Sequence, residues 1–407
     1  MMDPSTTAPV SKKICFYSIA THLGGAEKSL LDLVSYLGER SQGAYQPWVL
    51  LPKATGPLIE ILREKGIPTT VLPMPNRFLS LSREAPYRSV LLGIFIAPQL
   101  CIYAYRFCRI LNAEKVSLLH STGLKCHFVA ALLKPFHQKK IIWHLRDILK
   151  TDGLGAFLNF LRKATGTFVI SNSYATQKSL VLNDAPEKGS ARVIYNGIEP
   201  RVFFPHRQDH FRKLFGVEST VPIIGIMGVL ARWKGQVEFI RMARMLLSMG
   251  IDARFVIIGD QIYDTVADPD FRKVLDQEVA KLELNKFFHF AQFQEDAARA
   301  INGLDVLVHA SIRPEPFGRV ILESMACGVP VVASAAGGVL ELLEGQKTGC
   351  LFPPGDVLEM AKAVKSILVE ADLREVLIKN SRAVFLEKFT VQSCVDQIIE
   401  VYRRLWV

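Results

Sequence analysis

The stretch that decides the fold of the second half of this chain reads Arg313-Pro-Glu315-Pro-Phe-Gly318-Arg-Val-Ile-Leu-Glu323-Ser-Met-Ala-Cys-Gly328-Val-Pro330. Proline after Glu315 biases that residue away from the α region, so we expect its carboxylate in an extended loop. Residues 319–326 read as a short helix that Gly328 closes. The spacing therefore predicts one carboxylate in a loop and one on the following helix.

Eight helical residues rise about 12 Å, which sets the greatest separation expected of Glu315 and Glu323. Two acceptors at that distance suit a nucleotide-sugar, with one sugar bound at each end of its diphosphate. The alternative is a loop acid and a glutamate on a solvated helix face. The glycines and prolines around both residues, and the basic residues described below, favour the binding interpretation.

With 407 residues, of which 49% are hydrophobic, the chain is long enough for about two domains. Apolar, β-branched strands alternate with amphipathic helices in both halves, as in strand 13–19 with helix 28–37, and strand 222–228 with helix 236–249. Such alternation predicts an α/β fold of two doubly wound, Rossmann-like domains facing across a cleft. We expect domains at residues 1–204 and 205–390. The helix in 391–407 is expected to pack back on the first domain.

Positive charge is concentrated in the first half. Residues 1–200 contain 24 Lys and Arg against 13 Asp and Glu, whereas the remainder has 25 against 26. This asymmetry indicates an anionic partner, either membrane lipid or an acidic glycan. The basic runs are short and lack interleaved aromatic residues, so nucleic acid is not expected. Ordinary solvation of a basic surface is the alternative.

Residues 90–108 are the most apolar segment, but Pro98, Gln99 and Arg106 interrupt them. We expect a buried helix, with an interfacial helix flanked by arginines as the alternative. The seven cysteines are scattered and include no Cys-x-x-Cys pair, which is typical of a reducing compartment. No signal pattern is present at the N-terminus. The expected location is the cytoplasm, with peripheral contact to the inner face of the cytoplasmic membrane through the first domain.

Two basic residues, Arg232 and Lys234, follow the first strand of the second half. A guanidinium and an ammonium together can neutralise the diphosphate of a leaving nucleotide without a metal ion. The alternative is a solvated basic loop. We therefore expect these residues to bind the donor.

Gly24 and Gly25 follow the first strand of the chain, where a glycine pair lets backbone approach a phosphate at a helix N-terminus. His120 ends a strand of the first half, as His144 ends the next. His120 is a candidate catalytic residue that would hydrogen-bond a donor-sugar hydroxyl or help orient the reacting centre. A purely structural role for this histidine remains equally open.

The sequence Asp268-Pro-Asp270 has the form of a metal-binding Asp-x-Asp motif, but it lies just before a predicted helix. Asp is a common N-cap residue and Pro a common first helical residue, so we interpret the motif as a cap. No other cluster has metal-ligand spacing. Neither a metal nor any other cofactor is expected.

Taken together, Glu315-Pro-Phe-Gly, Glu323, Gly328-Val-Pro-Val-Val-Ala and Gly337-Gly338 with Glu341 resemble a known family. The chain is similar over residues 13–405 to the retaining glycosyltransferases of the GT-B fold, family 4, called the group 1 transferases. The resemblance implies transfer of a sugar from a nucleotide-sugar to an acceptor. It also implies retention at the anomeric carbon, with the leaving phosphate taking the acceptor proton.

The same resemblance assigns roles to individual residues. It implies that Glu315 binds donor-sugar hydroxyls near the anomeric carbon and that Glu323 binds the ribose. It implies that Arg232 and Lys234 hold the diphosphate, which the Gly24–Gly25 loop approaches. His120 is then expected near the donor sugar. Phe317 and Gly318 are included among the donor-binding residues.

Two departures from the family pattern bear on specificity. Gln292 stands where many members have glycine in the turn that helps read the base, and Ser121 follows His120 where many have a second histidine. The expected acceptor is a glycan or a lipid-linked molecule, in the synthesis of polysaccharide, lipopolysaccharide or glycolipid. A non-hydrolysing sugar-nucleotide epimerase and a non-catalytic nucleotide-sugar-binding scaffold are the two alternatives.

Overall fold

The computed structural model describes residues 11–19, 23–75, 86–149, 154–180, 189–261 and 270–406. For residues 86–98 and 154 it describes the backbone but not the side chains. The chain forms two compact units. Unit 1 is Met1–Asn172, Gln177–Ile194 and Cys394–Val407, and unit 2 is Ser173–Thr176 and Tyr195–Ser393.

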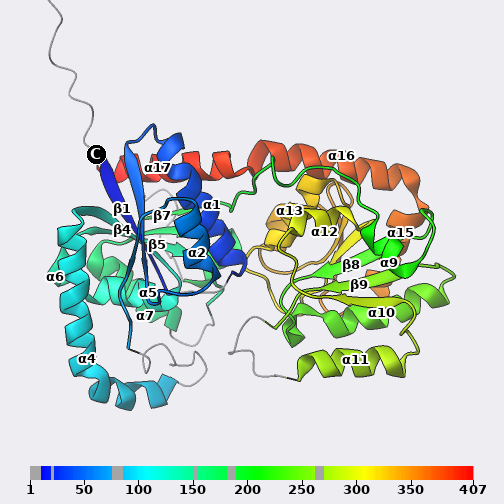
Figure 1. The fold of residues 1–407 in the computed structure, drawn as a ribbon, viewed down its shortest axis with the longest axis horizontal. Helices are drawn as coiled ribbons and strands as arrows, with labels where there is room; N and C mark the ends of the chain where they lie inside the picture. Colours follow the sequence, from blue (N-terminus) through cyan, green and yellow to red (C-terminus); the bar gives the residue numbers. More distant parts are fainter. Residues whose placement is uncertain are drawn as a thin grey trace, which may run out of the picture. The chain divides into compact units, whose positions relative to one another are not determined.

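Unit 1 is built on a parallel sheet with strand order β3-β2-β1-β4-β5-β6-β7 (Figure 1). Its strands are β1 (Lys12–Ser18), β2 (Tyr45–Leu51), β3 (Thr69–Val71), β4 (Val116–Thr122), β5 (Lys140–Leu145), β6 (Phe168–Ser171) and β7 (Ala191–Val193). Its helices are α1 (Gly25–Arg40), α2 (Pro57–Glu64), α4 (Pro86–Ala113), α5 (Leu124–Leu132), α6 (Lys134–His137), α7 (Leu154–Thr165) and α8 (Tyr174–Ser179). The first turn of α8 belongs to unit 2.

Unit 2 is built on a second parallel sheet, with strand order β10-β9-β8-β11-β12-β13. Its strands are β8 (Ile223–Met227), β9 (Arg254–Ile258), β10 (Phe288–Ala291), β11 (Val306–His309), β12 (Val331–Ser334) and β13 (Cys350–Phe352). The helices are α9 (His210–Phe215), η2 (Arg232–Lys234), α10 (Gln236–Ser248), α11 (Phe271–Lys281), α12 (Ala297–Asn302), α13 (Arg319–Cys327), α14 (Val339–Leu342), α15 (Val357–Val369) and α16 (Ala371–Lys388).

Both sheets are doubly wound, as the alternation of apolar strands and amphipathic helices predicts. Two buried clusters, one on each face of the second sheet, form the core of unit 2. The direction of winding changes between β8 and β11, which are neighbours in the sheet but not in the sequence. Ligands of such sheets bind beyond the carboxyl ends of the strands at this switch point.

The last helix, α17 (Val391–Leu405), starts in unit 2 and continues into unit 1. In unit 1 it buries Tyr402 against Tyr45, and Trp406 stacks on the same ring. The turn at 196–200, near the predicted boundary at 205, belongs to unit 2, because Ile198 exchanges backbone hydrogen bonds with Phe389 and Val391.

Several details differ from the sequence-based expectations. Helix α1 starts at Gly25 and not at Lys28, since Glu27 accepts a hydrogen bond from the backbone N–H of Gly24 and caps the helix. Helix α11 starts at Phe271, with Asp270 at its N-cap position. The Asp270 carboxylate pairs with Lys273 instead of capping the backbone, and residues 268–269 lie outside the described residues.

The apolar segment at 90–108 lies within the single helix α4, which Pro98 does not interrupt. Tyr103, Phe107 and Leu111 of this helix are buried, whereas Ile102 and Tyr105 are exposed, so its described part is not a fully buried helix. No helix among the described residues has the length and hydropathy needed to cross a membrane. All seven cysteines are free thiols, of which five are buried, Cys108 is half-buried and Cys101 is exposed.

The loop that carries Glu315 packs directly on a glycine pair. Gly337 forms a parallel bridge with Glu315, and the backbone N–H of Gly338 donates to the Glu315 carbonyl at 2.8 Å. Gly337 has φ +66°, and a Cβ atom there would overlap the Glu315 backbone. The close approach and the left-handed conformation both require glycine at this position.

Replacing Gly337 with alanine will therefore destabilise unit 2 more than the conformation alone explains. Gly355, with φ +79° and nothing within 4 Å of an added Cβ, is a matched control. We expect Gly355→Ala to cost about 1 kcal/mol for the left-handed backbone, and Gly337→Ala to cost about 1–3 kcal/mol more for the clash. Denaturant unfolding of both variants measures the difference, and equal losses would contradict this packing.

The buried contact between Tyr402 and His120 gives a second prediction. The Tyr402 hydroxyl lies 2.7 Å from His120 Nδ1, and both side chains are fully buried. Tyr402→Phe leaves a buried polar atom without its partner, so the free energy of unfolding should fall by about 1–3 kcal/mol. The control is Tyr105→Phe, because that side chain is exposed. Chemical denaturation that gives the same stability for both variants would show that the contact is unimportant.

Candidate functional site

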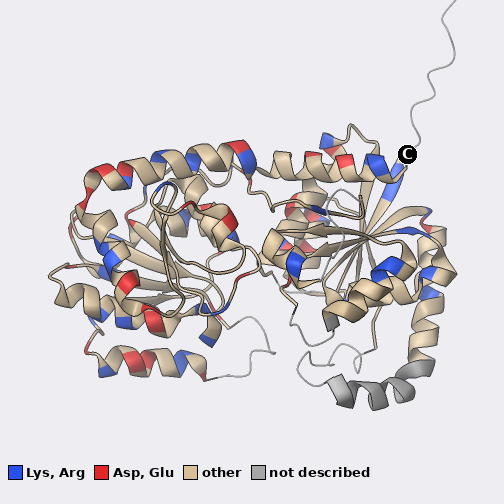
Figure 2. Cartoon of the chain, turned by 180° about the vertical axis from the view of Figure 1, so that it is seen from behind, with Lys and Arg blue, Asp and Glu red and all other residues tan. Residues whose placement is uncertain are grey.

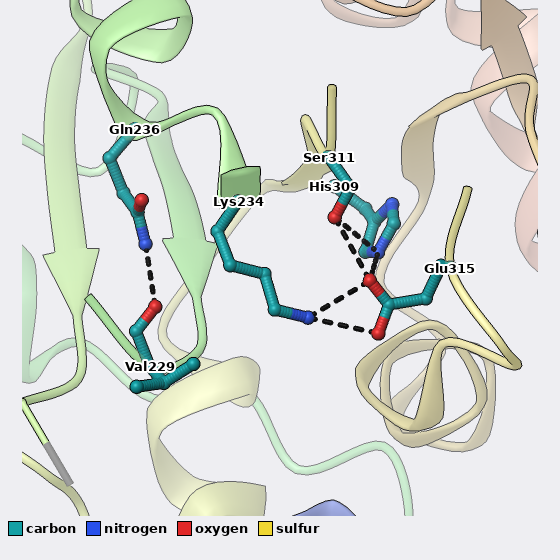
Figure 3. Close-up of polar contacts among 6 residues, drawn as sticks. All are labelled: Val229, Lys234, Gln236, His309, Ser311 and Glu315. Atoms are coloured by element: carbon teal, nitrogen blue, oxygen red, sulfur yellow. Dashed lines mark hydrogen bonds and ion pairs between the residues drawn. The ribbon is translucent and has the colours of Figure 1, made fainter. Parts of the chain in front are cut away.

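An ion pair between Lys234 and Glu315 lies at the switch point of the second sheet. Lys234 comes from the loop after β8, and Glu315 comes from the loop after the neighbouring strand β11. The Lys234 ammonium is 2.9 Å from Glu315 Oε1 and 3.0 Å from Oε2 (Figure 3). The two residues that the sequence places 81 positions apart thus meet at the carboxyl ends of adjacent strands.

Backbone contacts explain why these two loops meet. The N–H of Ile312 donates to the Trp233 carbonyl at 2.9 Å, which joins the loop after β11 to η2. Gln236 donates from its side chain to the Val229 carbonyl at 2.9 Å and so fixes the start of the η2 loop (Figure 3). Gly235, with φ +77°, lies against Ala310 where no Cβ atom would fit.

Two further residues, at and just after the end of β11, lie next to the Glu315 carboxylate. The Ser311 hydroxyl donates to Oε2 at 3.0 Å, and His309 Nε2 lies 3.6 Å from the same oxygen. His309 Nδ1 is buried and has no hydrogen-bond partner among the described residues. Sequence analysis missed both residues. Their position at and just after the end of β11, a few residues before Glu315, is the signal that would have identified them.

The charge state of Glu315 follows from this surrounding. Burial alone raises the pKa of its carboxyl group. The Lys234 ammonium and His309 lower the pKa by more than burial raises it, so the pKa lies well below its usual value. Glu315 is therefore ionised at neutral pH. A carboxylate in this state accepts hydrogen bonds, as sugar hydroxyls require, and it is a poor general acid.

The backbone next to Glu315 is held by a segment from the first half of the sequence. The hydroxyls of Ser173 and Thr176 donate to the Pro316 carbonyl at 2.6 and 3.3 Å. The Glu341 carboxylate accepts from the backbone N–H groups of Tyr174 and Ala175 at 2.8 and 2.9 Å. All of these residues belong to unit 2. Sequence analysis quoted Glu341 without a role, and the structure shows it fixing this segment.

The other predicted donor-binding residues of unit 2 lie on nearby elements. Glu323, on α13, is buried and accepts a hydrogen bond from Arg319 at 2.8 Å. Arg232 shares the η2 turn with Lys234, and its guanidinium lies 5.4 Å from the centre of the Phe271 ring. Gly318, with φ +98°, is the N-cap of α13.

The side chain of Phe317 has a different position from the one expected of a ligand contact. Its ring is 3% exposed and stacks on Tyr195 with 6.1 Å between ring centres. The ring therefore belongs to the core of unit 2, and only its backbone is left for a donor contact. Sequence reasoning overlooked this because an aromatic residue beside a binding glutamate is compatible with either role.

In unit 1, His120 lies in a buried chain of polar side chains. Its Nδ1 contacts the Tyr402 hydroxyl, and its Nε2 lies 3.0 Å from His144 Nδ1. Burial, with Arg146 and His127 nearby, lowers the pKa of His120 well below its usual value, so the ring is neutral. A sugar contact by His120 stays a prediction, and it requires the ring to exchange one of these partners.

Gly24 and Gly25 stand at the start of α1, as predicted, with residues 20–22 outside the described part of the chain. Gly24 has φ −94° and ψ −175°, an extended conformation that any residue adopts. Its approach to a phosphate stays a prediction. Within the described ranges, no group of three or more His, Cys, Asp or Glu residues is placed to hold a metal ion.

Comparison with known proteins finds relatives of this chain in sequence and in fold. Residues 207–384 match the family described as "Glycosyl transferases group 1". A solved structure of Anabaena Alr3699/HepE in complex with UDP-glucose is 26% identical, with a TM-score of 0.80, and the similarity covers 96% of this chain and 99% of that one.

Two curated relatives are similar at the sequence level. An uncharacterized glycosyltransferase, MJ1607 of Methanocaldococcus jannaschii, is 26% identical over 72% of this chain and 77% of its own length. The alpha-D-kanosaminyltransferase of Streptomyces kanamyceticus is 30% identical over 49% of this chain, and the match spans half of that relative. The GT-B fold expected from the sequence is thereby confirmed, and residues 207–384, within the second unit, are similar to the glycosyl transferases group 1 family.

Proposed function

We propose that this protein is a retaining, metal-independent glycosyltransferase that moves a sugar from a nucleotide-sugar to an acceptor. The observation that carries the proposal is the ionised Glu315 held by Lys234 at the switch point of the second sheet. The similarity to a structure titled as a UDP-glucose complex supports a nucleotide-sugar donor. The names of the relatives favour transfer over epimerisation or a binding-only role.

In this mechanism, Glu315 accepts hydrogen bonds from donor-sugar hydroxyls, and Glu323 accepts them from the ribose. Lys234 and Arg232 stabilise the charge that develops on the diphosphate as it leaves. Lys234 is already bound to Glu315, so an incoming diphosphate shares its ammonium with a carboxylate. The shared Lys234 ammonium would then lie between the sugar and the leaving group, where charge develops.

The low pKa of Glu315 bears on which group takes the proton from the acceptor. A carboxylate with a pKa this low is a weak base at neutral pH. This supports a mechanism in which the leaving phosphate itself takes the acceptor proton, on the same face of the sugar. The remaining proposals are that the acceptor is a glycan or a lipid-linked molecule and that the reaction serves polysaccharide, lipopolysaccharide or glycolipid synthesis.

Donor binding is tested first by a thermal-shift screen of nucleotide-sugars that starts with UDP-glucose. A donor at 100 times its Kd adds about 2.7 kcal/mol of stability. The bound donor then serves in a hydrolysis assay, in which proton NMR follows the anomeric form of the released sugar. Retention gives the anomer of the donor first. Release of the opposite anomer would overturn the proposed stereochemistry.

The role of Glu315 gives a kinetic prediction. Glu315→Gln keeps the size of the side chain but removes its charge, so turnover should fall by about a hundredfold or more. The control is Glu344→Gln, because that carboxylate is exposed and pairs with Lys347 in a surface loop of the same unit. Normal turnover in Glu315→Gln, with the donor still bound, would remove Glu315 from the reaction.

Metal independence gives a prediction with its own readout. Because Lys234 and Arg232 supply two positive charges for the diphosphate, a chelator should leave the initial rate unchanged. The assay compares protein treated with EDTA with protein supplied with excess magnesium. A rate that is lost on chelation and returns with magnesium would overturn this part of the proposal.

A further inference from the structure

The exposed apolar side chains of unit 1 lie on one set of helices. Among its described residues, all six large apolar side chains that are exposed belong to α4, α5, α6 or α7: Ile102, Tyr105, Leu132, Phe136, Phe157 and Phe160. The exposed fractions reach 72% for Phe136 and 65% for Phe160. Exposed aromatic residues that gather on one region of a protein mark a site of interaction.

These helices cover the same face of the first sheet. Buried residues of α4, α5 and α7, among them Phe107, Val129 and Leu158, form one cluster with the strands. Helix α6 packs against α4 and α5, and α7 packs against α5. Since their inner sides share one core, their outer sides form one surface, which we call the α4–α7 face (Figure 1).

The charge of the α4–α7 face has one sign. The sequences of the four helices contain seven Lys or Arg residues and no Asp or Glu. By contrast, α1 and α2 contain three basic and five acidic residues. In Figure 2, the described part of α4 has basic but no acidic residues. Arg162 is buried and the side chain of Arg88 is outside the described part, so the exposed or half-buried basic residues of this face are Arg106, Arg109, Lys125, Lys134 and Lys163.

Basic and aromatic groups alternate closely on this face. The guanidinium of Arg109 lies 5.6 Å from the centre of the exposed Tyr105 ring, and Arg106 is exposed beside it. On α7, Phe157 and Phe160 are exposed on one side of the helix, with Lys163 a turn beyond. Aromatic rings favour the boundary between water and lipid, and basic residues are attracted to anionic headgroups.

We propose that the α4–α7 face docks on a membrane surface that contains anionic phospholipid. Ile102 and Leu132 favour lipid over nucleic acid, because aliphatic side chains offer no ring on which a base would stack. The contact is peripheral, with aromatic and aliphatic side chains entering the headgroup region while Arg and Lys bind phosphates. The inference deepens the proposed function by naming the surface that would bring this enzyme to a lipid-linked acceptor.

The test measures partition of the whole protein into vesicles without any donor. One set of vesicles is pure phosphatidylcholine, and the other contains about 30% phosphatidylglycerol to supply negative surface charge. We expect at least about tenfold stronger partition into the anionic vesicles, and weaker partition as the salt concentration rises. Failure of the glycosyltransferase assays would leave this measurement unaffected, so the two proposals fail separately.

Two double variants with matched controls assign the binding to the α4–α7 face. Arg106→Glu with Arg109→Glu should weaken partition by about tenfold or more, because each basic residue near such a surface contributes about fivefold. The control, Arg374→Glu with Lys379→Glu on α16, makes the same change in net charge. The second double variant is Phe136→Ser with Phe160→Ser. Its control is Leu358→Ser with Leu386→Ser, at two exposed residues of unit 2.

The controls should partition like the unchanged protein, and circular dichroism should show the same fold in every variant. Equal partition into both kinds of vesicle would overturn the proposal, as would equal effects of the α4–α7 variants and their controls. Absence of binding to either vesicle would also overturn it, and would point to an acidic macromolecule as the partner of this face.

Discussion

The partly buried pair of Lys234 and Glu315 is the interaction on which the second unit's site depends. A charge taken out of water is costly unless an opposite charge and hydrogen bonds compensate for it. Here the carboxylate has the Lys234 ammonium, the Ser311 hydroxyl and the His309 ring around it. The pair therefore holds the loops after β8 and β11 together before any ligand binds.

The position of Glu315 is also determined from the backbone side. Gly337 and Gly338 pack against its main chain, and Ser173 and Thr176 bind the carbonyl of the next residue. Groups that are fixed in advance need little reorganisation when charge develops during a reaction. A carboxylate that is fixed both by its side-chain partners and by the packing of its backbone fits the role of orienting a sugar better than that of moving a proton.

The polar residues of unit 1 include a buried group and an exposed group. In its interior, His120, His144 and Tyr402 form a neutral, hydrogen-bonded chain that fastens the last helix to the sheet. On its surface, the α4–α7 face combines exposed aromatic residues with basic residues, and its four helices contain no Asp or Glu. Much of the basic excess that the sequence shows comes from these four helices, which an average over two hundred residues does not reveal.

By itself, the sequence determined the fold class, and it indicated Glu315, Lys234 and Glu323 as candidate site residues but neither His309 nor Ser311. Alternating strands and helices are local patterns, and the Glu315 to Glu323 stretch has a strong backbone signature of proline and glycine. Only the tertiary structure decided that Lys234 pairs with Glu315 and that Phe317 belongs to the core. It also placed His120 in a buried chain with Tyr402, 282 positions away. Contacts between distant residues depend on strand order and on loop packing, and neither of these has a periodic signal in a single sequence.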